Sequence, residues 1–343
     1  MAKSKTPLRI GVIGFGQWGP NHVRNFSQMD GCIVTRICDR TPSRLAAARK
    51  QFTSVETTRD AKFVIASAEV DAVVIATPVQ SHFHLARAAL RAGKHVLCEK
   101  PLALGSAESR ILCDLAQKHH RVLMVGHVFL YNPGTLHLKD AIRSGELGRI
   151  YYMDAVRTNL GPVRNDVGVI YDLASHDISI FNFLLGSRPI AVSAAGRAFL
   201  QKGIEDIGFL TLTYPKGVIC HVHTSWLNPR KVRQLTVVGD QKMAVWDDMN
   251  NLEPIRYYDK GVVPKSYASF GEFHMILRDG AITIPKLTSF EPLLRQDQEF
   301  LNSIRNRRAP AANGRFAADV VRVLESAIDS TRRGGRTIGI RYR

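Results

Sequence analysis

The sequence predicts an α/β protein of two domains, and two patterns along the chain support this expectation. Residues 8–125 alternate short apolar runs with runs of helical period, which is typical of a parallel sheet flanked by helices. From Arg149 onward, longer β-type runs follow one another across short turns, which indicates a mainly antiparallel sheet. A length of 343 residues with 45% hydrophobic content suits two separate cores. We therefore expect one domain over 1–125 and a second over 126–343.

The expected elements follow from these periods in order. In the first domain we expect strands at 8–13, 33–38, 70–76, 95–97 and 122–125, with helices at 44–52, 84–92 and 107–119. In the second domain we expect strands at 150–156, 190–195, 207–214, 218–226, 232–238 and 243–246, and helices at 292–304 and 317–331.

A glycine-rich run follows the first expected strand. Glycines at positions 14, 16 and 19 let the backbone turn tightly, approach a diphosphate and open a helix, and Pro20 suits the first helical turn. Asp39 follows the second strand, where its carboxylate suits a ribose 2′-hydroxyl and repels a 2′-phosphate. Arg40 and Arg44 come next and could pair with that phosphate instead. The run predicts a dinucleotide site that favours NAD, with NADP as the alternative.

Two polar segments stand at the ends of later strands. Thr77-Pro78 follows one strand, and Glu99-Lys100-Pro101 follows the next, at the sheet edge where open α/β sheets bind ligands. An ammonium group at Lys100 could stabilise alkoxide character while hydride leaves the same carbon, because its charge opposes the developing one. The alternative is a surface lysine paired with Glu99. We favour a catalytic lysine.

A third segment places two polar side chains on an apolar helix. The run 168–185, stopped by Gly186, is predicted to be a buried helix on which Asp172 and His176 share one face. A histidine titrates near neutral pH, so His176 is a candidate general base that Asp172 would orient. A structural Asp–His pair within the core is the alternative.

Composition excludes several classes of protein. The net charge of +17 is dispersed, and the densest clusters, 305–308 and 332–343, are expected to be solvated surface rather than a nucleic-acid site. Five scattered cysteines form no CxxC, and the neighbouring histidines are not spaced to share a helix face, so we expect no metal. Residues 1–7 lack a signal-peptide core and no run is long and apolar enough to span a membrane. We expect a cytoplasmic protein.

These motifs together resemble the Gfo/Idh/MocA oxidoreductase family over nearly the whole chain. The resemblance rests on the glycine run, Glu99-Lys100-Pro101, Gly126-His127, Asp172 with His176, and Phe290-Glu291-Pro292. It implies an N-terminal Rossmann domain and a C-terminal α+β domain with an open-faced sheet that forms contacts in a homodimer or homotetramer. It also implies that Lys100, Asp172 and His176 surround the reacting carbon. The cofactor-binding residues we expect are Gly14, Phe15, Gly16, Gln17, Trp18, Gly19, Asp39, Arg40, Thr77, Pro78, His82, Glu99 and Lys100.

Within the family, the runs 126–133, 159–164 and 224–231 are similar to a microbial subgroup that oxidises UDP-linked N-acetylhexosamines at C3. Cationic side chains there suit a diphosphate, and neutral ones suit sugar hydroxyls. The resemblance thus implies oxidation of a sugar nucleotide to a keto sugar. Alternatives are an inositol or unlinked-sugar dehydrogenase, an NAD-dependent glycosidase and a non-catalytic NAD-binding regulator. The substrate-binding residues we expect are His127, Tyr131, Asn159, Arg164, His176, Arg230 and Lys231.

Overall fold

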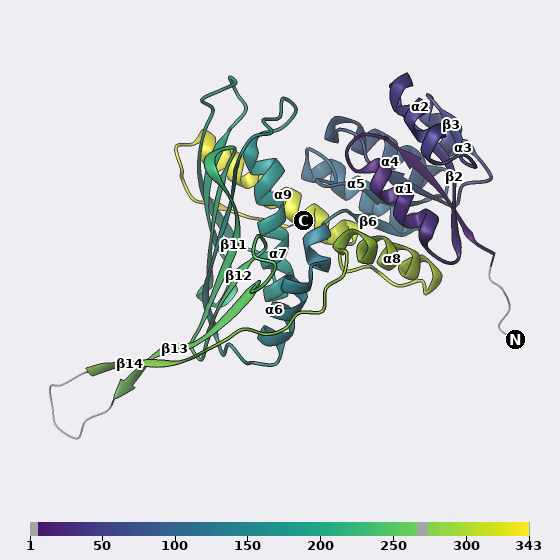
Figure 1. Cartoon of the computed structure of the whole chain (residues 1–343). Coiled ribbons are helices and arrows are strands. Elements are labelled where there is room, and N and C mark those ends of the chain that lie inside the picture. The colour runs from purple at the N-terminus through teal and green to yellow at the C-terminus, as the bar shows by residue number, and fades with distance from the viewer. Residues whose placement is uncertain (1–5, 266–273, 343) are drawn as a thin grey trace, which may run out of the picture. The chain divides into compact units, whose positions relative to one another are not determined.

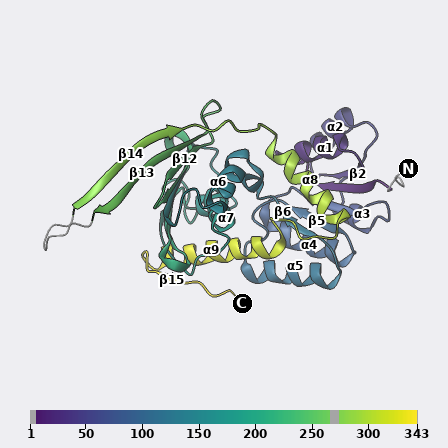
Figure 2. The same cartoon turned by 90° about the horizontal axis from the view of Figure 1, so that it is seen from below.

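A computed structural model describes residues 6–265 and 274–342 (Figure 1, Figure 2). Residues 1–5 of the expected N-terminal segment and Arg343 of the C-terminal basic cluster lie outside the described residues. The chain divides into two compact units. Unit 1 comprises Met1–Tyr131 and Phe290–Arg322, and unit 2 comprises Asn132–Ser289 and Val323–Arg343.

Unit 1 is built on a parallel sheet, as the sequence predicts. Within the described residues its six strands run in the order β3-β2-β1-β4-β5-β6, and every neighbouring pair is parallel. The central strand β4 is buried along its whole length, as expected where helices cover both faces of a sheet. The strands are β1 Leu8–Ile13, β2 Cys32–Cys38, β3 Glu56–Thr58, β4 Ala72–Ile75, β5 His95–Cys98 and β6 Leu123–Val125.

The helices of unit 1 follow the strands in alternation. Helix α1 begins at Gly19 with Pro20 in its first turn, where the missing N–H costs no helical hydrogen bond. The short helix α3 was not expected from the sequence, and the side chain of Asp60 caps it by accepting from the Lys62 N–H at 2.9 Å. The helices are α1 Gly19–Gln28, α2 Pro42–Gln51, α3 Ala61–Ala66, α4 His82–Arg91, α5 Ser106–Lys118 and α8 Pro292–Arg305.

Helix α8 brings a late part of the sequence into unit 1. The buried carboxylate of Asp297 accepts hydrogen bonds from His22 and Asn25, both of α1. The expected division at 125/126 therefore differs from the structure in two ways: the first unit continues to Tyr131, and residues 290–322 return to it. A buried carboxylate needs partners, and here they lie 275 residues away, which no local pattern reveals.

Unit 2 contains the mainly antiparallel sheet. In the described part of the chain it has nine strands in the order β14-β13-β12-β11-β7-β10-β9-β8-β15, and helices α6 and α7 lie against one face (Figure 1, Figure 2). Along β9, Leu210 and Leu212 are buried whereas Phe209 and Thr211 are exposed, so one face packs against the core and the other stays open. This agrees with the expected open-faced sheet.

Three features of unit 2 differ from the sequence expectation. Strand β10 pairs with β7 in parallel, although its other neighbour β9 is antiparallel. Strands β13 and β14 form an antiparallel pair that the sequence did not suggest, since charged residues and Pro264 interrupt the alternation there. Helix α6 was also not expected, and Asn132 caps it by accepting from the Gly134 N–H at 2.8 Å.

The bounds of unit 2 complete the description. Helix α9 has its first part in unit 1 and its second part in unit 2. The elements are α6 Pro133–Arg143, β7 Ile150–Leu160, a π-helical turn Ile170–Ala174, α7 Ser175–Leu185, β8 Ala191–Arg197, β9 Ile207–Thr213, β10 Ile219–Ser225, β11 Leu227–Gly239, β12 Met243–Asp247, β13 Ile255–Lys265, β14 His274–Thr283, α9 Gly314–Arg332 and β15 Ile338–Gly339.

Candidate active site

The glycine run forms the turn between β1 and α1 that the sequence predicts. Gly14 has φ +98°, and a Cβ atom built on it would lie 2.4 Å from the Ala76 carbonyl oxygen. A Cβ on Gly19 would lie 2.0 Å from the carbonyl oxygen of Gly14, so both positions exclude any side chain. At Gly16 the nearest atom is 3.6 Å away, on Arg44, which leaves the backbone approachable. A tight turn ending at a helix N-terminus fits a dinucleotide diphosphate.

Asp39 contacts the backbone of this turn. Its carboxylate accepts from the N–H of Phe15 at 2.7 Å and of Thr41 at 2.8 Å, and it lies 3.5 Å from the Arg44 guanidinium. Burial alone would raise the pKa of Asp39, but these two N–H donors and Arg44 hold it below its usual range. The carboxylate therefore stays ionised and braces the glycine turn. Arg40 is exposed, and contacts of Asp39 and Arg40 with a ribose stay a prediction.

The two loops that follow β4 and β5 are tied together by His82. Its Nε2 lies 2.8 Å from the Thr77 carbonyl oxygen, and its Nδ1 lies 2.8 Å from that of Pro101. The ring is 1% exposed, so it acts between the loops rather than on their outer surface. The predicted cofactor residues Thr77 and Pro78 are thereby held beside the loop that carries Lys100. A direct contact of His82 with the cofactor stays a prediction.

A buried histidine that the sequence reasoning missed supports this second loop. The Nε2 of His22 donates to Glu99 at 3.0 Å, and its Nδ1 donates to Asp297 at 3.0 Å. Burial alone would lower the pKa of His22, but the two carboxylates outweigh it and raise the pKa to about 10. Glu99 Oε2 also accepts from the backbone N–H of Lys100 at 3.3 Å. The imidazolium therefore fixes Glu99, and through it the backbone that bears Lys100.

A second buried histidine, His127, follows β6 at the same end of the sheet. It is 1% exposed, and no described residue forms a hydrogen bond with either ring nitrogen. Burial lowers its pKa to about 3, and the positive charge of Lys100 acts in the same direction. The ring is thus neutral. It packs against the Phe316 ring in a T-shaped arrangement, and the two ring centroids are 5.7 Å apart. Tyr131, also expected to bind substrate, is 6% exposed, and burial raises the pKa of its phenol.

In unit 2, Asp172 and His176 lie across a change of helix type. Asp172 belongs to the π-helical turn Ile170–Ala174, and His176 belongs to the first turn of α7. The predicted helix is therefore present from residue 170, as a π turn that continues into α7, and it stops as expected at Gly186, which has φ +60°. A π turn alters the angular spacing of side chains, so α-helical spacing alone did not fix how these two residues face.

Arginine pairs hold this region of unit 2 in place. Arg164 donates to Asp166 at 2.7 and 2.6 Å and to Asp172 at 3.2 Å. Its charge is thus matched by two carboxylates, whereas the sequence suggested a donor for a diphosphate. Behind the turn, Arg157 of β7 and Asp177 of α7 form a buried ion pair at 2.7 Å. This pair, which sequence reasoning missed, anchors the helix that carries His176.

The remaining expected substrate residues meet at one end of the unit 2 sheet. The side chain of Asn159, near the end of β7, donates to the Gly161 carbonyl oxygen. Arg230 and Lys231 lie in a bulged part of β11 and are exposed. The Thr158 hydroxyl donates to the Arg230 carbonyl oxygen at 3.2 Å and joins the two strands there. The structure thus brings Asn159, Arg230 and Lys231 together, although Asn159 already binds its own loop.

The residues that the structure describes lack two kinds of feature. They contain no helix long and apolar enough to cross a bilayer. They also contain no group of three or more histidine, cysteine or acidic side chains placed to hold a metal ion. All five cysteines are free thiols, and four of them, all except Cys113, are buried.

The turn after β1, the strand order of unit 1 and the loop at Lys100 define an NAD-binding oxidoreductase. Residues 8–127 match the model of the oxidoreductase family with an NAD-binding Rossmann fold, and residues 135–245 match the GFO/IDH/MocA C-terminal domain. The chain belongs to the Gfo/Idh/MocA oxidoreductase family. This confirms the predicted family, its two-part α/β fold, the enzyme class and NAD as the cofactor.

The chain is similar to several named dehydrogenases. The chain is 30% identical over 312 residues to UDP-N-acetylglucosamine 3-dehydrogenase of Acidithiobacillus ferrooxidans, covering 90% of this chain and 92% of that protein. A solved structure of that dehydrogenase superimposes with a TM-score of 0.82, covering 96% of this chain and 99% of the other at 25% identity. Inositol 2-dehydrogenase 2 of Saccharopolyspora erythraea is 33% identical over 63% of this chain and 66% of its own length. GenD2 from gentamicin A biosynthesis, solved with NAD, shares the fold at 22% identity, with a TM-score of 0.83 over 99% of this chain and 98% of its own.

Proposed function

We propose that this protein oxidises a sugar-nucleotide hydroxyl, at C3 of UDP-N-acetylglucosamine or a related UDP-sugar, and yields a keto sugar. The observation that carries the proposal is the similarity to UDP-N-acetylglucosamine 3-dehydrogenase over 90% of this chain. The similarity extends through both units, so it covers the candidate substrate residues as well as the NAD-binding motifs. A 3-keto product would be a ready substrate for transamination.

The proposed chemistry assigns one proton and one hydride. Bound NAD supplies the hydride acceptor at its nicotinamide ring. His176 takes the hydroxyl proton, and Lys100 stabilises the negative charge that grows on the oxygen as the carbonyl forms. Asp172 is proposed to orient His176. Its pairing with Arg164 would keep Asp172 ionised and fixed, which is what an orienting carboxylate requires.

The environment of Lys100 supports this role. Its neighbour His127 is neutral and buried, so the charge near the loop comes from the ammonium group rather than from an imidazolium. Lys100 is partly exposed, and a charge acts more strongly on a developing oxyanion where water has less access. Glu99, the nearest acid in sequence, is turned toward His22. The simple alternative of a surface Lys–Glu pair therefore fits the loop less well.

Substrate contacts are proposed for residues of both units. Arg230 and Lys231 are exposed cations at one sheet end and suit the diphosphate of a UDP-sugar. Asn159, Tyr131 and His127 remain candidates for sugar hydroxyls or an N-acetyl group. Arg164 is the weakest of the predicted diphosphate donors, because two carboxylates already pair with it.

An inositol or unlinked-sugar dehydrogenase is the second candidate, because another relative is an inositol 2-dehydrogenase. The test is NADH formation with UDP-N-acetylglucosamine, UDP-glucose, myo-inositol and glucose, each with NAD and with NADP. We expect turnover with the UDP-sugars and NAD, and a carbonyl at C3 by carbon NMR. Turnover with inositol alone would replace the proposal by the second candidate. Release of an aglycone without net NADH would indicate a glycosidase, and NAD binding without any turnover a regulator.

We further propose a homodimer or homotetramer in the cytoplasm. The open face of the unit 2 sheet carries exposed apolar side chains, including Tyr152, Phe209 and Ile219, which suit burial against a second copy. Sedimentation equilibrium of the purified protein tests the assembly. A monomer at all concentrations would contradict it.

A further inference from the structure

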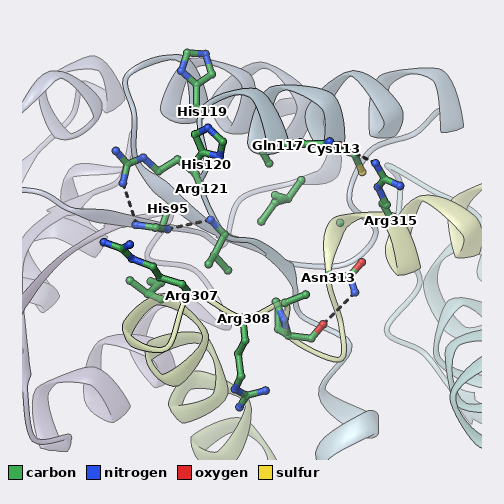
Figure 3. A pocket seen from close by; sticks show the side chains of 17 residues that line it. His95, Cys113, Gln117, His119, His120, Arg121, Arg307, Arg308, Asn313 and Arg315 are labelled. Carbon is green, nitrogen blue, oxygen red and sulfur yellow. Dashed lines mark hydrogen bonds between the residues drawn. The ribbon is translucent and has the colours of Figure 1, made fainter.

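A large cavity lies in unit 1 at the amino edge of the parallel sheet. It is a hollow of about 1070 Å³ that is open to solvent, and its wall includes His95, the first residue of β5, and Leu123, the first of β6. Lys100 lies past the carboxyl end of β5, about 10 Å away along that strand. The glycine turn follows β1 at the same carboxyl edge of the parallel sheet. The C-terminal ends of α5 and α8 and the loop before α9 complete the wall (Figure 3). This cavity is thus separate from the dinucleotide turn.

The wall of the cavity is strongly cationic. Arg121, Arg307, Arg308 and Arg315 line it, and no aspartate or glutamate stands among the described residues that do so. Of these four, only Arg308 is matched by a carboxylate in the described part of the chain, through a two-pronged pair with Glu299 at 2.9 and 2.6 Å. Arg315 donates to the neutral amide of Gln117 at 2.7 Å. As the sequence analysis expects, Arg307 and Arg308 are exposed to solvent, and both also line this cavity.

The hydrogen bonds of His95 show which ring nitrogen carries the hydrogen. Its Nδ1 accepts from the backbone N–H of Val122 at 3.0 Å, so the ring hydrogen of the neutral form is on Nε2. Burial, with Arg121 beside it, lowers the pKa of His95 to about 4, so the ring is neutral at pH 7. Nε2 lies 3.3 Å from a guanidinium nitrogen of Arg121, which is also a donor. Two N–H donors therefore converge, which an anionic oxygen accepting from both would satisfy.

The carboxylate that acts on the pKa of His95, that of Asp71, is already paired with an arginine. Asp71 raises the pKa of His95 slightly against the other influences, but both of its oxygens accept from Arg9, at 2.9 and 2.8 Å. In Figure 3 the side chains of Arg121 and Arg307 both reach toward His95. Asp71 therefore does not supply the acceptor that these donors suit.

The backbone at two wall positions supports a binding role. His120 has φ +52° and Arg307 has φ +50°, each just past the end of a helix. Glycine adopts this conformation without the cost that a side chain incurs, and it is the common residue there. Cations beside a helix C-terminus do favour the helix dipole, which is a structural reason for them. That reason does not explain why the side chains face a common cavity.

We propose that this cavity binds a small phosphorylated ligand through Arg121, Arg307, Arg315 and His95. Guanidinium groups bind phosphate oxygens in pairs, and the Nε2–H of a neutral histidine adds a directed donor. The volume is slightly above the range of about 300–1,000 Å³ that small-molecule sites occupy. The site is independent of the dinucleotide site and of the proposed substrate.

The test uses the full-length protein saturated with NAD, so that the dinucleotide site is filled. Inorganic pyrophosphate is titrated by calorimetry into the parent protein, into the double variant Arg121→Ala with Arg307→Ala, and into Lys118→Ala. Lys118 is exposed on the same helix α5 but does not line the cavity, so its substitution controls for net charge. We expect the double variant to bind pyrophosphate about tenfold or more weakly, because two paired contacts are lost. The pyrophosphate affinity of Lys118→Ala should equal that of the parent, and NAD affinity should be unchanged in both variants.

Three results would overturn the proposal. In the first, the parent and the double variant bind pyrophosphate equally well. In the second, Lys118→Ala loses as much pyrophosphate affinity as the double variant does. In the third, the parent protein does not bind pyrophosphate at all when NAD is present. A second measurement needs no cavity variant to fold: the Nε2–H resonance of His95, assigned from triple-resonance spectra of the parent protein, should shift on titration. An unmoved resonance would also contradict the site.

Discussion

Two buried histidines at the same end of the unit 1 sheet have opposite protonation states. His22 faces carboxylates with both ring nitrogens, and its pKa rises to about 10. His127 has no hydrogen-bonding partner among the described residues and lies near Lys100, and its pKa falls to about 3. Burial lowers the pKa of both rings, so the neighbouring groups alone set the difference. One histidine is a fixed cation that braces a loop, and the other is a neutral part of the core.

The largest expected effect is on stability. His22→Phe should lower the free energy of unfolding by about 3–5 kcal/mol, because it leaves the carboxylates of Asp297 and Glu99 buried without their counter-charge. The matched variant His127→Phe should change it by only about 1 kcal/mol, since no protein hydrogen bond is lost. Urea denaturation of both variants measures the contrast. Similar losses in the two would contradict the assigned protonation states.

The second effect is on catalysis. Lys100→Ala should lower kcat by about 10²–10³-fold, the usual cost of removing one donor to a developing oxyanion. NAD affinity should persist, because Glu99 and the backbone remain held by His22. The same variant should raise the pKa of His127 above about 3, since a repelling charge is gone. Steady-state kinetics and an NMR titration provide the two readings, and a variant with the parent kcat would remove the proposed mechanism.

The third effect is a pH dependence of stability to which His22 should contribute. Its pKa is raised from 6.5 in the unfolded chain to about 10 in the folded protein. The resulting stabilisation is complete below pH 6.5 and declines as pH rises toward 10. His22→Gln should lack this decline. Melting temperatures across that window test it, and parallel curves for parent and variant would contradict it.

The smallest expected effect separates the contributions that Glu99 and Asp297 make to the pKa of His22. Glu99→Gln removes one negative charge and keeps the shape of the side chain, so the pKa of His22 should fall from about 10 but stay above 6.5, because Asp297 remains. A fall of one pKa unit corresponds to about 1.4 kcal/mol. An NMR titration of His22 in this variant measures the share of each acid. A pKa below 6.5 would show that Glu99, not Asp297, supplies most of the charge.

Some residues of the candidate site could be predicted from the sequence, and others could not. The glycine turn, Asp39 and Lys100 lie where the motifs predict, because each follows a strand of the same parallel sheet. His22 was missed although it stands on the first turn of the predicted helix α1. Its significance depends on Asp297, far along the chain, which local patterns do not reveal.

Unit 2 was less predictable because its key features are local exceptions. The π turn at Asp172 breaks the helical period, and the bulge before Val232 breaks the strand register that carries Arg230. Arg164 was expected to face a ligand, but it pairs with Asp166 and Asp172 instead. The number of charged residues in a sequence does not show which arginines are already paired with a carboxylate.

The residue order alone determined the alternation of elements, the need for glycine at 14 and 19, and the place of Lys100 at a strand end. Those features depend on backbone sterics and short-range periodicity, which neighbouring residues carry. The tertiary structure decided which buried groups are charged, where 290–322 belong, and that four arginines line one cavity. Electrostatic energy depends on distance in space and on access to water, and folding alone brings such distant residues together.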